Sequence, residues 1–195
     1  MKVLVVGATG ATGQLVVKQL LDRDVEVKAI VRFPEKLPKS VLEHDKLSVI
    51  TVSNIFQLSK RELAGYINGC DAVISCLGHN LTIKGIFGPP FKLVTDATRL
   101  ICEAIKENKP KKTIKYILMN STGNSNRDLR ESVSLAQKCV LGIIRLLVPP
   151  QSDNEKAADY LRIELGQNNQ EIEWVAVRPD SLLNIDEVTT YSVYP

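Results

Sequence analysis

The sequence is poor in the features that mark metal sites, disulfide frameworks and membrane spans. Among its 195 residues are two histidines and four cysteines, and no two cysteines have the C-x-x-C spacing of a metal or redox site. The cysteines lie mostly in apolar segments, which fits a reducing compartment. The longest later apolar run, 140–148, contains Arg145 and is too short to cross a bilayer. We therefore expect a cytoplasmic protein with no metal and no membrane partner.

A strong excess of charge of one sign is also missing. The formal net charge is +3, which is too small to indicate binding to nucleic acid. Apolar residues make up 44% of the chain, an ordinary share for a globular protein. The length suits one well-buried core better than two domains. We therefore predict a single domain over residues 1–195.

The first residues carry the strongest motif that is present. A strand-forming run at 3–6 stops at Gly7, and Gly10 and Gly13 follow at every third position before an amphipathic segment at 14–22. A strand, a glycine turn and a helix in succession form the dinucleotide-binding pattern of βαβ folds. The glycines allow a sharp turn, the approach of a pyrophosphate and close helix packing. The first N–H groups of the helix and its dipole would then face the phosphates.

A second predicted strand, 25–31, ends directly before Arg32. In a βαβ nucleotide fold this position meets the adenosine ribose, where an acidic residue favours NAD. Here the first acid, Glu35, comes only after Pro34. The planar guanidinium of Arg32 suits a 2′-phosphate, so we predict NADP(H) rather than NAD(H). If Arg32 is merely solvated or stacks on adenine, this preference is weak.

The remaining chain alternates between predicted strands and helices. The alternation predicts an α/β fold, a Rossmann-type doubly wound parallel sheet with helices on both faces. Further strands are predicted at 47–52, 71–77, 114–119 and 172–177, and helices at 58–67, 91–108, 135–147 and from Asp153, as N-cap, to about Gln167. Ligands bind beyond the carboxyl ends of the strands in such sheets. That edge is predicted to carry Gly7, Arg32, Ser53, Gly78, Ser121 and Pro179.

With these residues in place, the chain resembles an atypical short-chain dehydrogenase/reductase, closest to the NmrA-like and biliverdin- or flavin-reductase-like branch. The resemblance covers nearly all of residues 1–183. The stretches that carry it are 7–13, 31–36, 71–75, Ser121, 156–162 and 174–179.

The resemblance implies where the cofactor lies. It places the glycine turn around the pyrophosphate, Arg32 at the 2′-phosphate, Leu77 and Gly78 at the ribose and Ser121 at the nicotinamide. Pro179 and Ser181 would close over the carboxamide side. The full set implied to contact the cofactor is Gly7, Thr9, Gly10, Ala11, Thr12, Gly13, Arg32, Phe33, Ser53, Asn54, Ile55, Cys76, Leu77, Gly78, Ser121, Lys156, Pro179 and Ser181.

Three features depart from the family pattern. The catalytic Tyr-x-x-x-Lys is absent, and if Lys156 matches the family lysine, Ser152 stands at the tyrosine position. A serine is a much weaker acid than a phenol, so proton donation by the usual route is in doubt. Asn54 stands where relatives often carry an aspartate toward the adenine. Relatives also continue past Asn184, so 179–195 is expected to belong to a small, shortened substrate lobe.

Ser121 and Lys156 are the candidate catalytic residues. Ser121 could polarise a carbonyl or hold an acceptor, or it could simply begin a Ser-Thr-Gly turn. Lys156 could hold the nicotinamide ribose or be a solvated helix lysine. His79 could reach the substrate cleft, although a lone loop histidine is more often exposed. Cys76 lies in an apolar run, where core packing is the better interpretation.

These residues predict an NADPH-dependent oxidoreductase that reduces a flavin, a quinone or a similar small acceptor. Such acceptors suit a site without the tyrosine, because the reduced product can take its proton from water. One alternative is an NmrA-like sensor that binds NADP without turnover and signals to a protein partner. A second is an enzyme similar to nucleotide-sugar epimerases, which rely on the missing tyrosine. The nearly all-apolar helix 135–147 leaves monomer and homodimer open.

Overall fold

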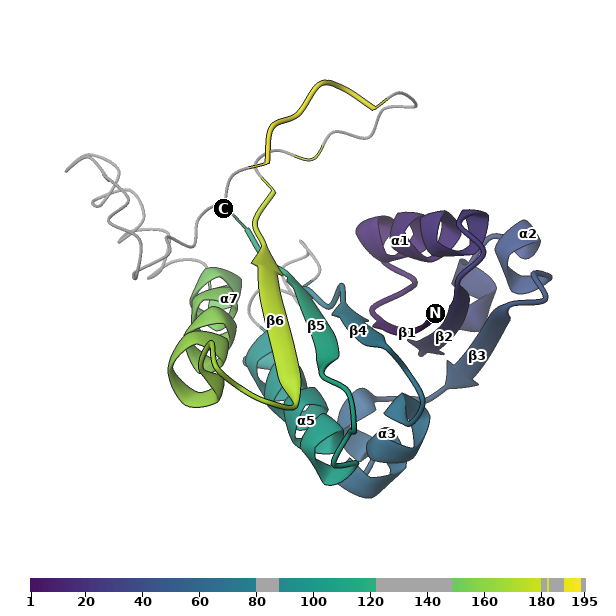
Figure 1. The fold of residues 1–195 in the computed structure, drawn as a ribbon. Helices are drawn as coiled ribbons and strands as arrows, with labels where there is room; N and C mark the ends of the chain where they lie inside the picture. The colour runs from purple at the N-terminus through teal and green to yellow at the C-terminus, as the bar shows by residue number, and fades with distance from the viewer. Residues whose placement is uncertain (80–87, 122–148, 180–181, 183–187, 194–195) are drawn as a thin grey trace.

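The computed structural model describes residues 1–79, 88–121, 149–179, 182 and 188–193 (Figure 1). Its described strands form one sheet of six, all neighbours parallel, in the order β3-β2-β1-β4-β5-β6. The strands are β1 (Lys2–Val6), β2 (Glu26–Val31), β3 (Leu47–Thr51), β4 (Ala72–Ser75), β5 (Ile114–Met119) and β6 (Ile172–Val177). The strand order reverses between β1 and β4, the point beside which doubly wound sheets bind ligands. The predicted Rossmann-type fold is confirmed.

Helices cover both faces of this sheet (Figure 1). The helices and turns are α1 (Ala11–Asp22), η1 (Pro34–Lys36), α2 (Lys39–Leu42), η2 (Ile55–Gln57), α3 (Lys60–Ile67), α5 (Leu93–Glu107) and α7 (Pro149–Asp159). Helix α7 continues into a π-helical turn, η3 (Tyr160–Leu165). Helices α3, α5 and α7 share one apolar core, and α1 and α2 contribute to the other.

The central strand β1 shows why the sheet needs both layers. Leu4 and Val6 pack into the core shared with α3 and α5, whereas Val3 and Val5 pack into the core shared with α1. All four side chains are at most 1% exposed. A strand buried on both faces must be apolar throughout, which is why its sequence shows a continuous run instead of alternation.

Helix α3 begins where its capping residues place it. The hydroxyl of Ser59 accepts a hydrogen bond from the backbone N–H of Glu62, and the Glu62 carboxylate accepts one from the N–H of Ser59. The Ser59 hydroxyl also donates to the Glu62 carboxylate, at 2.7 Å, and this bond, together with the one from the Ser59 N–H, lowers the pKa of Glu62. This reciprocal capping box sets the first residue at Lys60, two residues after the predicted start.

One predicted boundary is wrong in an informative way. Asp153 was expected to cap the last helix, but α7 begins at Pro149 and Asp153 lies inside it. The pair Pro149–Pro150 therefore starts a helix, since proline is tolerated in the first turn, where no N–H partner is needed. The predicted helix 135–147 lies outside the described residues. Within the described ranges, no helix is long and apolar enough to cross a membrane.

Candidate functional site

Two of the three motif glycines are required by the packing of the turn itself. Gly7 has a φ of +75°, and a Cβ built on it would lie 2.6 Å from the carbonyl carbon of Cys76. A Cβ on Gly13 would lie 2.1 Å from the carbonyl oxygen of Gly7. Real Cβ atoms do not approach backbone this closely. The turn between β1 and α1 is therefore held directly against the exit of β4.

Gly10 differs because, among the described residues, no packed side chain or backbone excludes a Cβ at this position. A Cβ there would meet only the carbonyl oxygen of Gly7, at the ordinary contact distance of 3.5 Å. Gly10 is the N-cap of α1, which has no side-chain cap and no acidic residue in its first turn. The exposed turn in front of α1, here called the cradle, therefore presents the first N–H groups of the helix, which have no partner within it, and the positive end of the helix dipole. This cradle fits the pyrophosphate of a dinucleotide.

A basic corner adjoins this cradle. The Arg32 guanidinium carbon and the Lys36 ammonium lie 5.9 Å and 4.9 Å from the centre of the exposed Phe33 ring. The Gln14 side-chain amide donates to the carbonyl oxygens of Thr9, at 3.1 Å, and Lys36, at 3.0 Å. Gln14 thus ties the glycine turn to the segment that carries the two cations. Sequence reasoning predicts a role for Arg32 at this corner and assigns none to Gln14 or Lys36.

The segment after β3 has local structure of its own. The Asn54 side-chain oxygen accepts a hydrogen bond from the N–H of Phe56, at 3.0 Å, and caps η2. The Ser53 hydroxyl bonds to the side chain of Gln57, and Ile55 is buried. Asn54 therefore caps η2. The sequence analysis, which considered Asn54 only as a contact for the adenine, did not predict this role.

The exit of β4 lies beside the glycine turn. The N–H of Cys76 donates to the carbonyl oxygen of Val6, at 2.9 Å, and the N of Leu77 would lie 2.8 Å from a Cβ on Gly7. Burial raises the pKa of the Cys76 thiol to about 11, so this sulfur is a neutral packing group and not a nucleophile. Gly78, exposed, and His79 follow at this edge.

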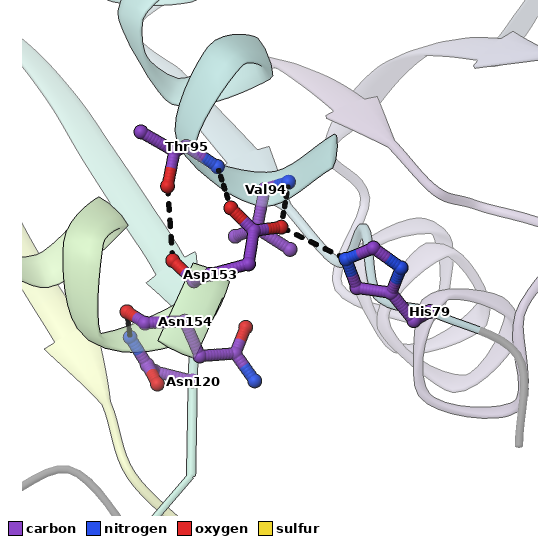
Figure 2. Close-up of polar contacts among 6 residues, drawn as sticks. All are labelled: His79, Val94, Thr95, Asn120, Asp153 and Asn154. Carbon is purple, nitrogen blue, oxygen red and sulfur yellow. Dashed lines mark hydrogen bonds and ion pairs between the residues drawn. The ribbon is translucent and has the colours of Figure 1, made fainter. Parts of the chain in front are cut away.

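A polar cluster links this edge to α5 and α7 (Figure 2). The Asp153 carboxylate accepts hydrogen bonds from the backbone N–H groups of Val94, at 2.7 Å, and Thr95, at 3.0 Å. It therefore caps α5, whose own N-cap residue, Lys92, makes no side-chain cap. The Thr95 hydroxyl donates back to the Asp153 carbonyl oxygen, at 2.9 Å. A lysine side chain has no hydrogen-bond acceptor, so Lys92 at the N-cap is the sequence feature which indicates that another segment must cap α5.

His79 joins the same cluster. Its Nε2 lies 2.9 Å from Asp153 Oδ2, and the two side chains are only 6% and 1% exposed. The expectation that this histidine is exposed is therefore wrong. The two residues are 74 positions apart in the sequence, so no local pattern could have paired them.

The end of β5 is anchored on the same turn of α7. The Asn120 side chain donates to the carbonyl oxygen of Asn154, at 3.1 Å (Figure 2). The Asn120 side-chain oxygen accepts from the N–H of Ser121, at 2.8 Å. The Ser121 hydroxyl oxygen is buried and has no hydrogen-bond partner among the described residues. An unsatisfied buried hydroxyl costs about 1–3 kcal/mol. This cost is removed if a bound molecule supplies the partner.

The other predicted site residues are less informative. Lys156 is exposed on α7, whereas Asp153 and Ala157 on that helix are buried. Pro179 is half-buried and follows β6 at the same edge of the sheet. Ser181 lies outside the described residues. Across the described part of the chain, no group of three or more His, Cys, Asp or Glu side chains could hold a metal ion.

Solved structures with the same fold include an oxidoreductase, an NAD(P)-binding family protein and an epimerase. The oxidoreductase ylbE from Lactococcus lactis has a TM-score of 0.67 at 18% identity, covering 95% of this chain and 72% of that chain. A Rossmann-fold NAD(P)-binding family protein from Shigella flexneri has a TM-score of 0.61 at 18% identity, covering 96% and 71%. UDP-glucuronic acid 4-epimerase from Bacillus cereus, solved with NAD, has a TM-score of 0.65 at 18% identity, covering 91% and 56%. At these identities the likeness concerns the fold.

Sequence comparison identifies the family. No curated protein matches the chain, but the model of a family described as NAD(P)H-binding matches residues 7–195. The match begins at Gly7, the residue that follows β1 and opens the turn before α1. The chain therefore belongs to this NAD(P)H-binding family.

Proposed function

We propose that the protein is an NADPH-dependent oxidoreductase that reduces a flavin, a quinone or a similar small acceptor. The observation that carries this proposal is the open cradle at Gly10, in front of an α1 N-terminus without a cap or an acid. Gly10 is exposed, so packing among the described residues does not require a glycine there, and the first N–H groups of α1 have no partner inside the helix. A phosphate-bearing ligand accounts for both features.

Residues around the cradle would hold the cofactor. The backbone of the turn from Gly7 to Gly13 would bind the pyrophosphate, and Arg32 with Lys36 would bind a 2′-phosphate. Two cations around Phe33 support NADP(H) over NAD(H), since a 2′-phosphate brings about two negative charges to this corner. The bound cofactor supplies a hydride, while the protein supplies position and electrostatics.

The acceptor would lie beside Ser121. Its unpaired, buried hydroxyl can donate a hydrogen bond to an acceptor oxygen or nitrogen. Lys156 stays a prediction for the nicotinamide ribose. Because the Tyr-x-x-x-Lys pair is missing, acceptors that do not depend on a phenolic proton donor are favoured.

The test is NADPH oxidation, followed by nicotinamide absorbance, with a free flavin and a simple quinone as acceptors. We expect saturable turnover that falls when Ser121 is replaced by alanine, because its hydroxyl no longer holds the acceptor. Ser40→Ala, at an exposed serine on α2, is the matched control. Turnover unaffected by Ser121→Ala would remove Ser121 from the site, and absent turnover with every acceptor would overturn the enzymatic proposal.

An NmrA-like sensor is the second candidate, favoured by the missing Tyr-x-x-x-Lys pair. Such a protein would bind NADP(H) and present its state to a protein partner without turnover. Tight NADPH binding measured by calorimetry, together with no oxidation in the assay above, would select this candidate. An enzyme similar to nucleotide-sugar epimerases is less favoured, because that chemistry needs the tyrosine.

A further inference from the structure

The two faces of strands β5 and β6 are covered unequally. On one face, side chains such as Tyr116 and Ile172 are at most 1% exposed and pack into the core shared with α5 and α7 (Figure 1). On the other face, Val175 and Val177 are 49% and 42% exposed. The main strand contacts of α1 and α2, the described helices on that side, are with β1, β2 and β3. We call this second face of β5 and β6 the open face.

The open face has an apolar centre. It carries Ile117 and Met119 from β5 and Val175 and Val177 from β6, each alternating with a side chain of the opposite face. Parallel sheets are normally covered on both faces. Apolar side chains gathered on an uncovered face are typical of an interaction surface. The sequence of the two strands therefore suits a face that another surface covers.

Two opposite charges lie at the amino-terminal end of the open face. Lys115 of β5 and Glu173 of β6 are both exposed, and they are register partners across the two strands. The two levels above them hold only apolar pairs, Ile117 with Val175 and Met119 with Val177. Each level of the face thus pairs a residue of β5 with a residue of β6, and only the first level is charged.

We propose that the open face is the interface of a homodimer, in which two copies stack this face about a two-fold axis parallel to the strands. Such an axis keeps every residue at its level and places β5 of one copy over β6 of the other. Lys115 then lies over the partner's Glu173, and Glu173 lies over the partner's Lys115. The apolar pairs meet in the same way at the next levels. Facing sheets pack in this aligned manner, about 10 Å apart.

The charges favour a second copy over an unrelated partner. A face that carries one positive and one negative charge at the same level complements itself when it is turned by 180°. The chain after β6 offers further apolar contact, with side chains that are 65–85% exposed at Leu182, Val188, Tyr191 and Val193. A stable dimer buries roughly 800 Å² per partner, so this segment is expected to enlarge the interface. Both ligand edges would lie at the same end of the dimer.

Sedimentation of the full chain tests the dimer without cofactor or turnover, so the result is independent of the proposed function. We expect a particle of twice the 21.6 kDa chain mass. Lys115→Glu and Glu173→Lys should each raise the dissociation constant at least tenfold, because each change places like charges opposite one another at two symmetric positions. Lys39→Glu, at an exposed lysine on α2, is the matched control and should leave the dimer intact.

Mixing the two charge variants separates a contact between copies from an effect within one chain. In a mixed dimer, the two acidic side chains of the Lys115→Glu chain face the two basic side chains of the Glu173→Lys chain. We therefore expect the equimolar mixture to dimerise at a concentration at which each variant alone is monomeric. A mixture that stays monomeric would overturn the proposed pairing.

The apolar centre gives a further test. Val175→Asp should abolish the dimer, whereas Ile163→Asp, at a side chain of η3 that is 65% exposed, should not. A monomeric parent protein would overturn the inference, because another part of the chain or a different partner would then cover the face. A dimer that Val175→Asp breaks but Lys115→Glu leaves intact would also overturn it, since pairing through the edge of β6 alone does not involve β5.

Discussion

The two halves of the ligand edge are built in different ways. In the nucleotide half, formed by β1, α1 and the segment after β2, Gln14 joins carbonyls 5 and 22 residues away. In the half proposed to hold the acceptor, here called the acceptor half and formed by the ends of β4 and β5 with α7, Asp153 contacts partners 58 to 74 residues away. The first half is a local motif that a sequence displays directly. The second exists only after the sheet has brought distant segments together.

The largest expected effect concerns the two kinds of glycine in the nucleotide half. Gly13→Ala should lower the free energy of unfolding by at least ~3 kcal/mol, because its Cβ would collide with the Gly7 carbonyl. Gly10→Ala should change stability by less than about 0.5 kcal/mol yet weaken NADPH binding, because the methyl group enters the cradle. Urea denaturation measures the stability of each variant, and calorimetric titration measures its affinity for NADPH. Equal stability losses would show that Gly10 is also a packing glycine.

In the acceptor half, Asp153→Ala should cost about 3 kcal/mol of stability. The change leaves the first N–H groups of α5 and the His79 ring without their shared acceptor. Asp45→Ala is the matched control, because Asp45 pairs with the other histidine while 85% exposed; it should cost less than about 0.5 kcal/mol. Denaturation of the two variants in urea gives the comparison. Similar losses in the free energy of unfolding would mean that Asp153, with its buried partners, stabilises the protein no more than the exposed Asp45 does.

A smaller, selective effect is expected at the basic corner. Arg32→Asp should weaken NADPH binding at least tenfold, roughly 1.4 kcal/mol, and leave NADH binding nearly unchanged. The reason is that only NADPH presents a 2′-phosphate to the guanidinium. Arg61→Asp, at an exposed arginine on α3, controls for net charge. Equal losses for the two nucleotides would remove Arg32 from 2′-phosphate recognition.

The smallest effect is expected for Gln14→Ala, which cuts the tie between the glycine turn and the basic corner. Losing two amide hydrogen bonds to backbone carbonyls should cost about 1 kcal/mol of stability. NADPH affinity should fall a few-fold as the corner loosens. Gln19→Ala, exposed on the same helix, is the control. An unchanged NADPH affinity would show that the corner keeps its place without Gln14.

The sequence predicted most of the fold because its strands are short apolar runs. The bounds of β5 and β6 were predicted to the residue, and the order of the strands and longer helices along the described chain is as expected, whereas the short helix α2 was not predicted. The strand, glycine turn and helix of the nucleotide half were also predicted, because these elements follow one another directly in the sequence. The acceptor half was not: Asp153 is predicted to cap its own helix, whereas it lies inside α7 and caps α5. His79 was taken for a surface residue, because nothing near it in sequence could bury it.

The borrowed cap of α5 has a consequence for the order in which the chain assembles during synthesis. The buried side chains of the core around α1 all come from residues 3–72, so its packing partners leave the ribosome early. Helix α5 is made soon afterwards, but its first N–H groups wait for Asp153, which is synthesised 58 residues after Thr95. Until then, the helix has a frayed first turn and Lys92 at its N-cap. The arrival of one carboxylate therefore closes the helix and orients His79 in the same event.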